Sequence, residues 1–178
     1  GMSAKLEKVE RVLVHTFDMS IAGCVDCTHE REYTILFSDP ELAQKNAHQL
    51  WDYAAKRKEL DNLKKVSFLP EKEHLEEVYS DKYGMIFKWI PMFYFQDRGV
   101  CEQILASSVR ALLPDGILFL VGLGILKSLF NGLNSESNSS NINDVDQLNF
   151  STLILPFVLI LLVIKSKYPS SNSILFSL

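Results

Sequence analysis

The stretch YTILFSDPELAQKNAHQLWDYA, residues 33–54, decides the fold that this sequence predicts. It opens on a β-branched and aromatic run, residues 33–37, which is typical of a buried strand. Ser38 or Asp39 can then cap a helix, and Pro40 suits the first helical position because no backbone N–H is needed there. The predicted helix carries one apolar stripe at helical spacing: Ala43, Ala47, Leu50, Trp51 and Ala54.

Asp39 therefore stands at the carboxyl end of a predicted strand, just before a helix. In open α/β sheets ligands bind at this edge, and an acidic residue there commonly takes the ribose hydroxyls of a nucleotide. The simpler role is a helix cap, because capping residues occur at most helix starts. Both interpretations of Asp39 stay open at this point.

The rest of the chain repeats the alternation of strand and helix. Short apolar runs predict further strands at residues 12–17, 66–69, 83–90 and 117–121, with a turn at 113–116. Helical patterns cover residues 71–79 and the stretch from Asp97 to Leu112, and a short helix is predicted within 21–29. This order predicts an α/β fold, a Rossmann-like, mainly parallel sheet with helices on both faces.

Composition disfavours several classes of function. The net charge is −4 and the pI is about 5.6, so the chain offers no overall attraction to a phosphate backbone, and we expect no nucleic-acid partner. The N-terminus is charged, which is not typical of a signal peptide, and three cysteines, an odd number, fit a reducing compartment better than a disulfide framework. A cytoplasmic location is therefore expected.

The C-terminal section is unusually apolar. Only six of the 40 charged residues lie beyond Leu123, so we expect residues 2–122 to form an α/β domain and residues 123–178 to complete it. That section holds a Ser/Asn-rich loop at 134–149 and an apolar segment within 150–164. The segment is shorter than the roughly 20 residues that span a bilayer. Core or partner interface is favoured, and a membrane-associated segment is the alternative.

Two later stretches carry a family resemblance. Residues 83–89, YGMIFKW, and residues 112–121, LLPDGILFLV, are similar to the fourth-strand and fifth-strand motifs of the class I S-adenosylmethionine-dependent methyltransferases. Asp39 and residues 66–70 match the ends of the second and third strands of that family. The resemblance covers about residues 9–121 and implies S-adenosylmethionine as cofactor.

The resemblance also implies roles for individual residues. Asp39 would hold the ribose, Glu71 would lie near the adenine, and Gly23 and Asp18 would belong to the cofactor loop. Lys88 and Trp89 would face the transferred methyl group. The implied function is methyl transfer to a small-molecule substrate, with no catalytic residue and no metal ligand assigned.

One departure keeps a second hypothesis open. Glycines let the backbone of the family's first loop approach the cofactor, but residues 16–23 read TFDMSIAG, with one late glycine. The alternative is a non-catalytic, methyltransferase-like interaction module that docks through residues 150–164 onto a protein or membrane. A Rossmann-like binder of another nucleotide is a third hypothesis.

The pair Cys24 and Cys27, with His29 nearby, is a weak signal for a metal or redox site. Structural zinc needs four ligands, and this stretch supplies three. Ordinary thiols are the favoured interpretation. The aromatic residues Trp89, Phe93, Tyr94 and Phe95 could line a substrate pocket, although core packing is favoured for them.

Overall fold

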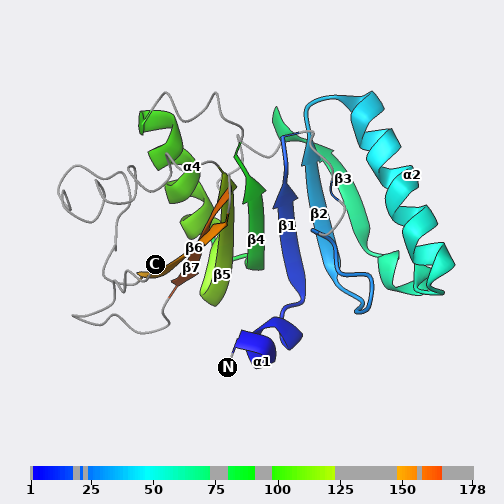
Figure 1. The fold of residues 1–178 in the computed structure, drawn as a ribbon, viewed down its shortest axis with the longest axis horizontal. Helices are drawn as coiled ribbons and strands as arrows, with labels where there is room; N and C mark the ends of the chain where they lie inside the picture. Colours follow the sequence, from blue (N-terminus) through cyan, green and yellow to red (C-terminus); the bar gives the residue numbers. More distant parts are fainter. Residues whose placement is uncertain are drawn as a thin grey trace. The chain divides into compact units, whose positions relative to one another are not determined.

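The structure, a computed structural model, describes residues 2–17, 21, 24–72, 80–90, 98–122, 148–155 and 158–165. The chain divides into two compact units, unit 1 (Gly1–Glu77) and unit 2 (Val78–Leu178). Each unit has its own group of hydrogen-bonded strands and its own helix against them (Figure 1).

Unit 1 contains three parallel strands in the order β3-β2-β1. Their bounds are Arg11–His15 for β1, Glu32–Phe37 for β2 and Val66–Pro70 for β3. The central strand β2 is buried over four consecutive residues, 33–36, as expected when both faces of a parallel sheet are covered. The strands predicted near residues 12–17, 33–37 and 66–69 are thus confirmed.

Helix α2 (Pro40–Lys56) connects β2 to β3, and Figure 1 shows it returning alongside the strands. Three members of the predicted stripe, Ala43, Leu50 and Ala54, are its buried residues, while Trp51 lies near Phe68 of β3. A short 3₁₀ helix, η1 (Leu60–Leu63), follows and buries Leu63. The apolar stripe therefore fixes which side of α2 meets the sheet.

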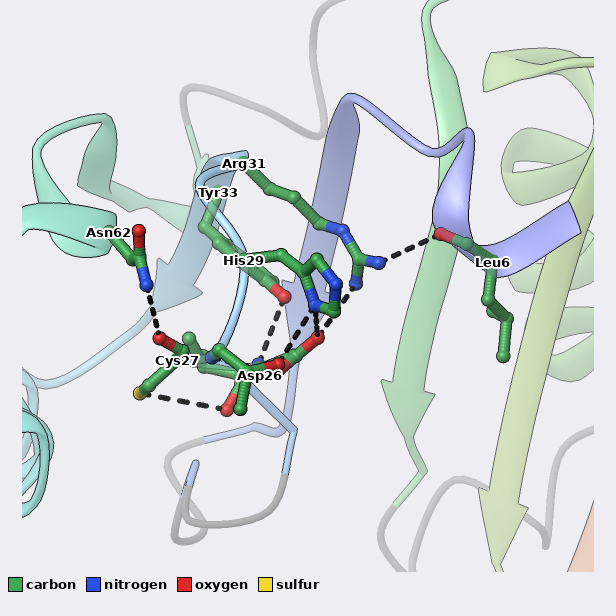
Figure 2. Close-up of polar contacts among 9 residues, drawn as sticks. Leu6, Asp26, Cys27, His29, Arg31, Tyr33 and Asn62 are labelled. Atoms are coloured by element: carbon green, nitrogen blue, oxygen red, sulfur yellow. Dashed lines mark hydrogen bonds and ion pairs between the residues drawn. The ribbon is translucent and has the colours of Figure 1, made fainter. Parts of the chain in front are cut away.

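The helix predicted within residues 21–29 is wrong for the part that the structure describes, because residues 24–29 form turns. Asp26 Oδ1 accepts hydrogen bonds from the Thr28 backbone N–H, at 2.9 Å, and from the Thr28 hydroxyl. Such local bonds from a side chain to the backbone compete with a helix. The Tyr33 hydroxyl accepts the Asp26 N–H at 2.9 Å and holds the turn against β2 (Figure 2).

Unit 2 combines parallel and antiparallel pairing in the strand order β4-β5-β7-β6. The parallel pair β4 (Tyr83–Trp89) and β5 (Leu112–Gly122) is connected through α4 (Arg98–Ala111). Strand β7 (Val158–Lys165) runs antiparallel to both β5 and β6 (Leu148–Leu155). With unit 1, this is an α/β, Rossmann-like arrangement with a mainly parallel sheet, as the sequence predicts.

The apolar C-terminal segment forms strands. Strand β7 lies between β5 and β6, and Val163 is completely buried. Residues 173–178 and most of the helix predicted at 71–79 lie outside the described residues. Among the described parts of the chain, no helix combines the length and apolar character needed to cross a bilayer.

Strand β5 begins with an irregularity where the sequence predicts a turn. Tyr83 pairs with Leu112, but Met85 pairs with Ile117, so three extra residues are inserted on the β5 side. Asp115, within this insertion, has a φ of 64°, in the left-handed region. A Cβ at Gly116 would lie 2.6 Å from Leu112 Cγ and 2.7 Å from the Leu113 carbonyl oxygen. Only glycine fits there.

The end of β7 is tied to the end of α4. Lys165 Nζ donates to the carbonyl oxygens of Leu112 and Val109, at 2.8 and 3.1 Å, and to Asp81 Oδ1 at 3.0 Å. The backbone N–H of Asp81 in turn donates to the Arg110 carbonyl at 3.0 Å. Carbonyl groups that the last helical turn leaves without an intrahelical donor are thereby satisfied.

We expect Gly116→Ala to lower the free energy of unfolding by about 1–3 kcal/mol, because a backbone oxygen in the insertion cannot move away cheaply. Urea denaturation followed by circular dichroism measures the loss. Asp115→Asn is the matched control, since asparagine tolerates a positive φ, and it should change stability by less than about 0.5 kcal/mol. Equal stability of Gly116→Ala and the unchanged chain would contradict the steric argument.

Candidate functional site

The carboxyl ends of β1, β2 and β3 meet at one edge of unit 1, because the three strands are parallel. Leu36 of β2 pairs with His15 on one side and with Leu69 on the other. Asp39 follows three residues after Leu36, and Glu71 follows two residues after Leu69. The strand register thus brings to one edge two acidic residues that are 32 positions apart in the sequence.

Asp39 is the N-cap of α2. Its backbone is extended, with φ −108° and ψ 113°, and its Oδ1 accepts the Glu41 N–H at 2.9 Å. Pro40 occupies the first helical position, as predicted. The predicted cap is confirmed, and the ribose-binding role of Asp39 stays a prediction.

Glu71 forms a contact that no sequence pattern indicated. Its Oε2 lies 3.0 Å from His15 Nε2, across β2, and His15 is only 2% exposed. The partners are 56 residues apart, so only the parallel register brings them together. The contact with His15 orients the Glu71 carboxylate. Its predicted position near the adenine stays a prediction.

Phe17 begins the loop after β1. Its φ is 53°, in the left-handed region that favours glycine, and its ring stacks on that of His15 with centroids 3.8 Å apart. The stacked ring gives a reason for a bulky residue at this position. Gly23 and Asp18, predicted for the cofactor loop, lie outside the described residues.

Lys88 and Trp89 end strand β4 of unit 2. Trp89 is partly exposed, whereas Lys88 is only 5% exposed, which is unusual for a lysine. Desolvation by burial lowers the pKa of Lys88 from 10.5 to about 8. Sequence reasoning named Lys88 through the fourth-strand motif but did not predict that it would be buried.

The turn before β2 holds a second cluster of polar side chains. Asp26 Oδ2 lies 2.9 Å from His29 Nδ1 and 3.4 Å from Arg31 Nη1, and Arg31 Nη2 donates to the Leu6 carbonyl at the end of α1 (Met2–Glu7) (Figure 2). Desolvation raises the pKa of Asp26, but hydrogen bonds from Thr28 and His29 and the charge of Arg31 outweigh it and lower the pKa. These contacts anchor the turn.

Cys24 and Cys27, in the same turn, are both buried. Desolvation raises the pKa of Cys24 to about 11 and also raises the pKa of Cys27, with Glu59 and Asp26 adding to the second shift. Both therefore remain thiols at neutral pH, whereas metal binding and redox chemistry require the thiolate. Cys27 Sγ is 4.0 Å from the Val25 carbonyl oxygen, and the Cys27 carbonyl accepts Asn62 Nδ2 at 2.8 Å. The favoured interpretation, ordinary thiols, agrees with this burial.

Comparison with solved structures finds the same fold over most of the chain. The N-methyltransferase NodS from Bradyrhizobium japonicum is similar with a TM-score of 0.60 and 10% identity, over 93% of this chain and 92% of that one. A predicted O-methyltransferase from Agrobacterium tumefaciens gives 0.58 and 11%, over 93% and 78%. A TehB-like S-adenosylmethionine-dependent methyltransferase from Corynebacterium glutamicum gives 0.54 and 13%, over 88% and 80%.

No family model matches the chain. No curated protein matches it either. The chain thus has the fold of the class I S-adenosylmethionine-dependent methyltransferases, as the two sequence motifs imply. Identities of 10–13% establish the fold alone.

We expect Lys88→Met to raise the free energy of unfolding at pH 7 by roughly 3 kcal/mol, because methionine fills similar space without a buried ammonium. The pKa of Lys88 is lower in the folded than in the unfolded chain, so the unfolded chain binds more protons between pH 8 and 10.5. The unchanged chain therefore gains stability as the pH rises through that window, and the advantage of Lys88→Met fades.

Urea midpoints measured from pH 7 to pH 10.5 check this expectation. Lys82→Met is the matched control, because Lys82 directly precedes the same strand and is partly exposed. A Lys88→Met advantage that stays constant over the whole pH range would contradict the burial of a titrating amine.

Proposed function

We propose that the chain is an S-adenosylmethionine-dependent methyltransferase that acts on a small molecule. The observation that carries the proposal is the position of Asp39, a carboxylate at the carboxyl end of β2 in a fold shared with methyltransferases. Ligands of open α/β sheets bind at that edge. A cytoplasmic location and the absence of a nucleic-acid partner belong to the same proposal.

The Asp39 carboxylate can serve the helix and a ligand together. One hydrogen bond, from the Glu41 N–H to Oδ1, is needed for the cap. A carboxylate has two oxygens with about four acceptor sites, so ribose hydroxyls can donate to the same group. The cap fixes the orientation of the side chain before a ligand arrives, which reduces the entropy lost on binding.

Glu71 fits the adenine end of the same ligand. The carboxylate lies at the carboxyl end of β3, it is 20% exposed, and its contact with His15 restricts its rotamers. A carboxylate oxygen is a suitable acceptor for the exocyclic amine of adenine. On this proposal Asp39 and Glu71 hold the adenosine part from two adjacent strand ends.

When bound, the cofactor supplies a methyl group on a sulfonium sulfur. The chain would contribute mostly by positioning, which requires few catalytic side chains. Lys88 and Trp89 remain predicted to face the transferred methyl group, and Gly23 and Asp18 remain predicted members of the cofactor loop.

Calorimetric titration with S-adenosylhomocysteine tests the proposal. We expect micromolar binding by the unchanged chain, and binding at least about tenfold weaker by Asp39→Ser, because serine keeps the cap but is too short to reach a ribose. Asp39→Ala should lose the same affinity and, in addition, about 1 kcal/mol of stability through the lost cap.

The comparison of the two variants separates ligand binding from helix capping. Millimolar or absent binding by the unchanged chain would overturn the proposal. Equal affinity of Asp39→Ser and the unchanged chain would leave Asp39 as a cap alone.

A specific observation favours a second candidate, the non-catalytic interaction module. The Phe17 ring stands at the start of the loop where the backbone would approach a cofactor, and it is packed on buried His15. Residues 150–164, the predicted docking segment, lie mostly in β6 and β7 of unit 2. In this candidate the fold is retained and the partner, a protein or a membrane surface, replaces the cofactor.

Phe17→Gly distinguishes the two candidates. Glycine adopts a φ of 53° without strain and removes the ring, so we expect S-adenosylhomocysteine to bind about tenfold more tightly to this variant if the ring obstructs the loop. Phe17→Leu, which keeps a bulky side chain, is the control and should show no gain. Weaker binding by Phe17→Gly would instead make the ring part of the ligand-binding surface.

A further inference from the structure

The end of helix α2 and the segment that follows it carry a concentration of positive charge. Residues 56–65, KRKELDNLKK, hold five of the 18 lysines and arginines of the chain and two of its 22 acidic residues. The chain as a whole has a net charge of −4, so this segment is opposite in sign to the rest. All five cations are exposed, and we call them the basic surface: Lys56, Arg57, Lys58, Lys64 and Lys65.

Neighbouring carboxylates neutralise only part of this charge. Asp61 Oδ1 lies 3.7 Å from Lys64 Nζ, and Glu30 Oε1 lies 3.5 Å from Lys65 Nζ. Both pairs are exposed, and exposed ion pairs are weak and are screened by salt. The second acidic residue of the segment, Glu59, has its Oε2 atom buried.

The first three cations have no carboxylate partner among the described residues. Arg57 instead lies over the ring of Tyr53, with its guanidinium carbon 4.4 Å from the ring centroid. The helix dipole favours Lys56 and Arg57 at the end of α2. It does not account for the cations beyond η1.

Lys58 occupies a position at which glycine is favoured. The Lys58 N–H donates to the Ala55 carbonyl at 3.1 Å, and the Glu59 N–H donates to the Ala54 carbonyl at 2.9 Å. These two hydrogen bonds form a Schellman motif, whose left-handed residue is usually glycine. Lys58 has a φ of 60°, and a lysine is less stable than a glycine there. The folding of α2 therefore does not explain a cation at this position.

Two exposed apolar side chains lie among the cations. Tyr53 is 49% exposed beside Arg57, and Leu60 of η1 is 44% exposed, two residues beyond Lys58. Proteins bind an anionic bilayer through this combination, in which cations meet the lipid head groups and apolar or aromatic side chains enter the interface.

The basic surface lies at the edge of unit 1 that is opposite to Asp39. Helix α2 begins at the carboxyl end of β2 and runs back, and Lys65 directly precedes Val66, the first residue of β3, which pairs with Tyr33. Figure 1 shows α2 ending, and β3 beginning, at the amino-terminal ends of the strands. A small ligand and a partner of the basic surface would thus occupy different ends of unit 1.

A bilayer fits this surface better than a nucleic acid does. A long polyanion would extend beyond the five cations and meet the negative charge of the rest of the chain. A flat membrane touches one end of the unit, and the remaining charges then lie beyond the Debye length of about 8 Å. The exposed leucine also has a use in a lipid interface, whereas phosphate contacts need none.

We propose that the basic surface, together with Tyr53 and Leu60, is a docking surface for an anionic phospholipid bilayer. The cations bind the lipid head groups, and Leu60 inserts between them. This inference goes beyond the proposed function and does not depend on it.

Sedimentation of the intact chain with lipid vesicles tests the proposal. Phosphatidylcholine vesicles with about 30% phosphatidylserine should bind the chain, and vesicles of phosphatidylcholine alone should bind it at least about tenfold more weakly. Raising NaCl from about 0.1 to about 0.5 M should remove most of the binding, because the Debye length shortens. No binding to the anionic vesicles, or equal binding to both kinds, would overturn the proposal.

The variant Lys56→Gln/Lys58→Gly removes two cations and should bind the anionic vesicles at least about tenfold more weakly. Unfolding would not explain this loss, since glycine is favoured at position 58 and the midpoint of thermal unfolding should be unchanged or higher. The matched control is Lys45→Gln/Lys72→Gln, which changes the net charge equally at exposed positions in the first half of α2 and after β3. The control should bind like the unchanged chain, and an equal loss in both variants would overturn the proposal.

Two further measurements identify the partner. Leu60→Ser should weaken vesicle binding by about fivefold, because an inserted apolar side chain is lost, and unchanged binding would overturn the insertion of Leu60. Short duplex DNA should not displace the chain from vesicles at equal phosphate concentration, and displacement would overturn the proposal in favour of a nucleic acid. Vesicle binding without any binding of S-adenosylhomocysteine would keep this surface and reject the proposed function.

Discussion

Parallel pairing is the constraint from which the rest of unit 1 follows. Parallel neighbours must be joined by a crossover on a face of the sheet, so β2 is followed by the amphipathic helix α2 and β2 itself is buried on both faces. The same geometry collects the carboxyl ends of β1, β2 and β3 at one edge. A polar residue that directly follows one of these strands therefore lies at that edge, however far apart such residues are in the sequence.

This edge is held by side chains as well as by backbone pairing. The contact between His15 and Glu71 bridges the two outer strands across β2, and the ring of Phe17 covers the histidine. A left-handed backbone conformation at a bulky residue is unfavourable, and such conformations are concentrated at functional sites. The stacking of Phe17 on a buried, paired imidazole offsets part of that strain. The shape of this edge therefore depends on three residues that no local pattern connects.

The sequence predicts local features well and long-range polar contacts poorly. The strands of unit 1, the α2 stripe and the Asp39 cap each depend on neighbouring residues, and all three are observed. The helix predicted within 21–29 fails because Asp26 and Thr28 bond to each other and to local backbone, which composition alone does not reveal. The motif YGMIFKW also gives no sign that its lysine is buried, since an isolated lysine in a strand normally faces water. Burial of both sheet faces overrides that preference.

The hydrogen bonds from Lys165 to the end of α4 limit the order in which the parts of unit 2 can fold. The lysine lies 54 and more positions beyond the helix that it caps, so the carbonyls of Val109 and Leu112 receive this donor only after β7 has paired with β5. Contacts of such long sequence separation form late, because the chain must first lose the entropy of closing a large loop. During synthesis on the ribosome, α4 and β5 emerge well before Lys165. The edge of β5 that pairs with β7 therefore stays unpaired until residues 158–165 have been synthesised.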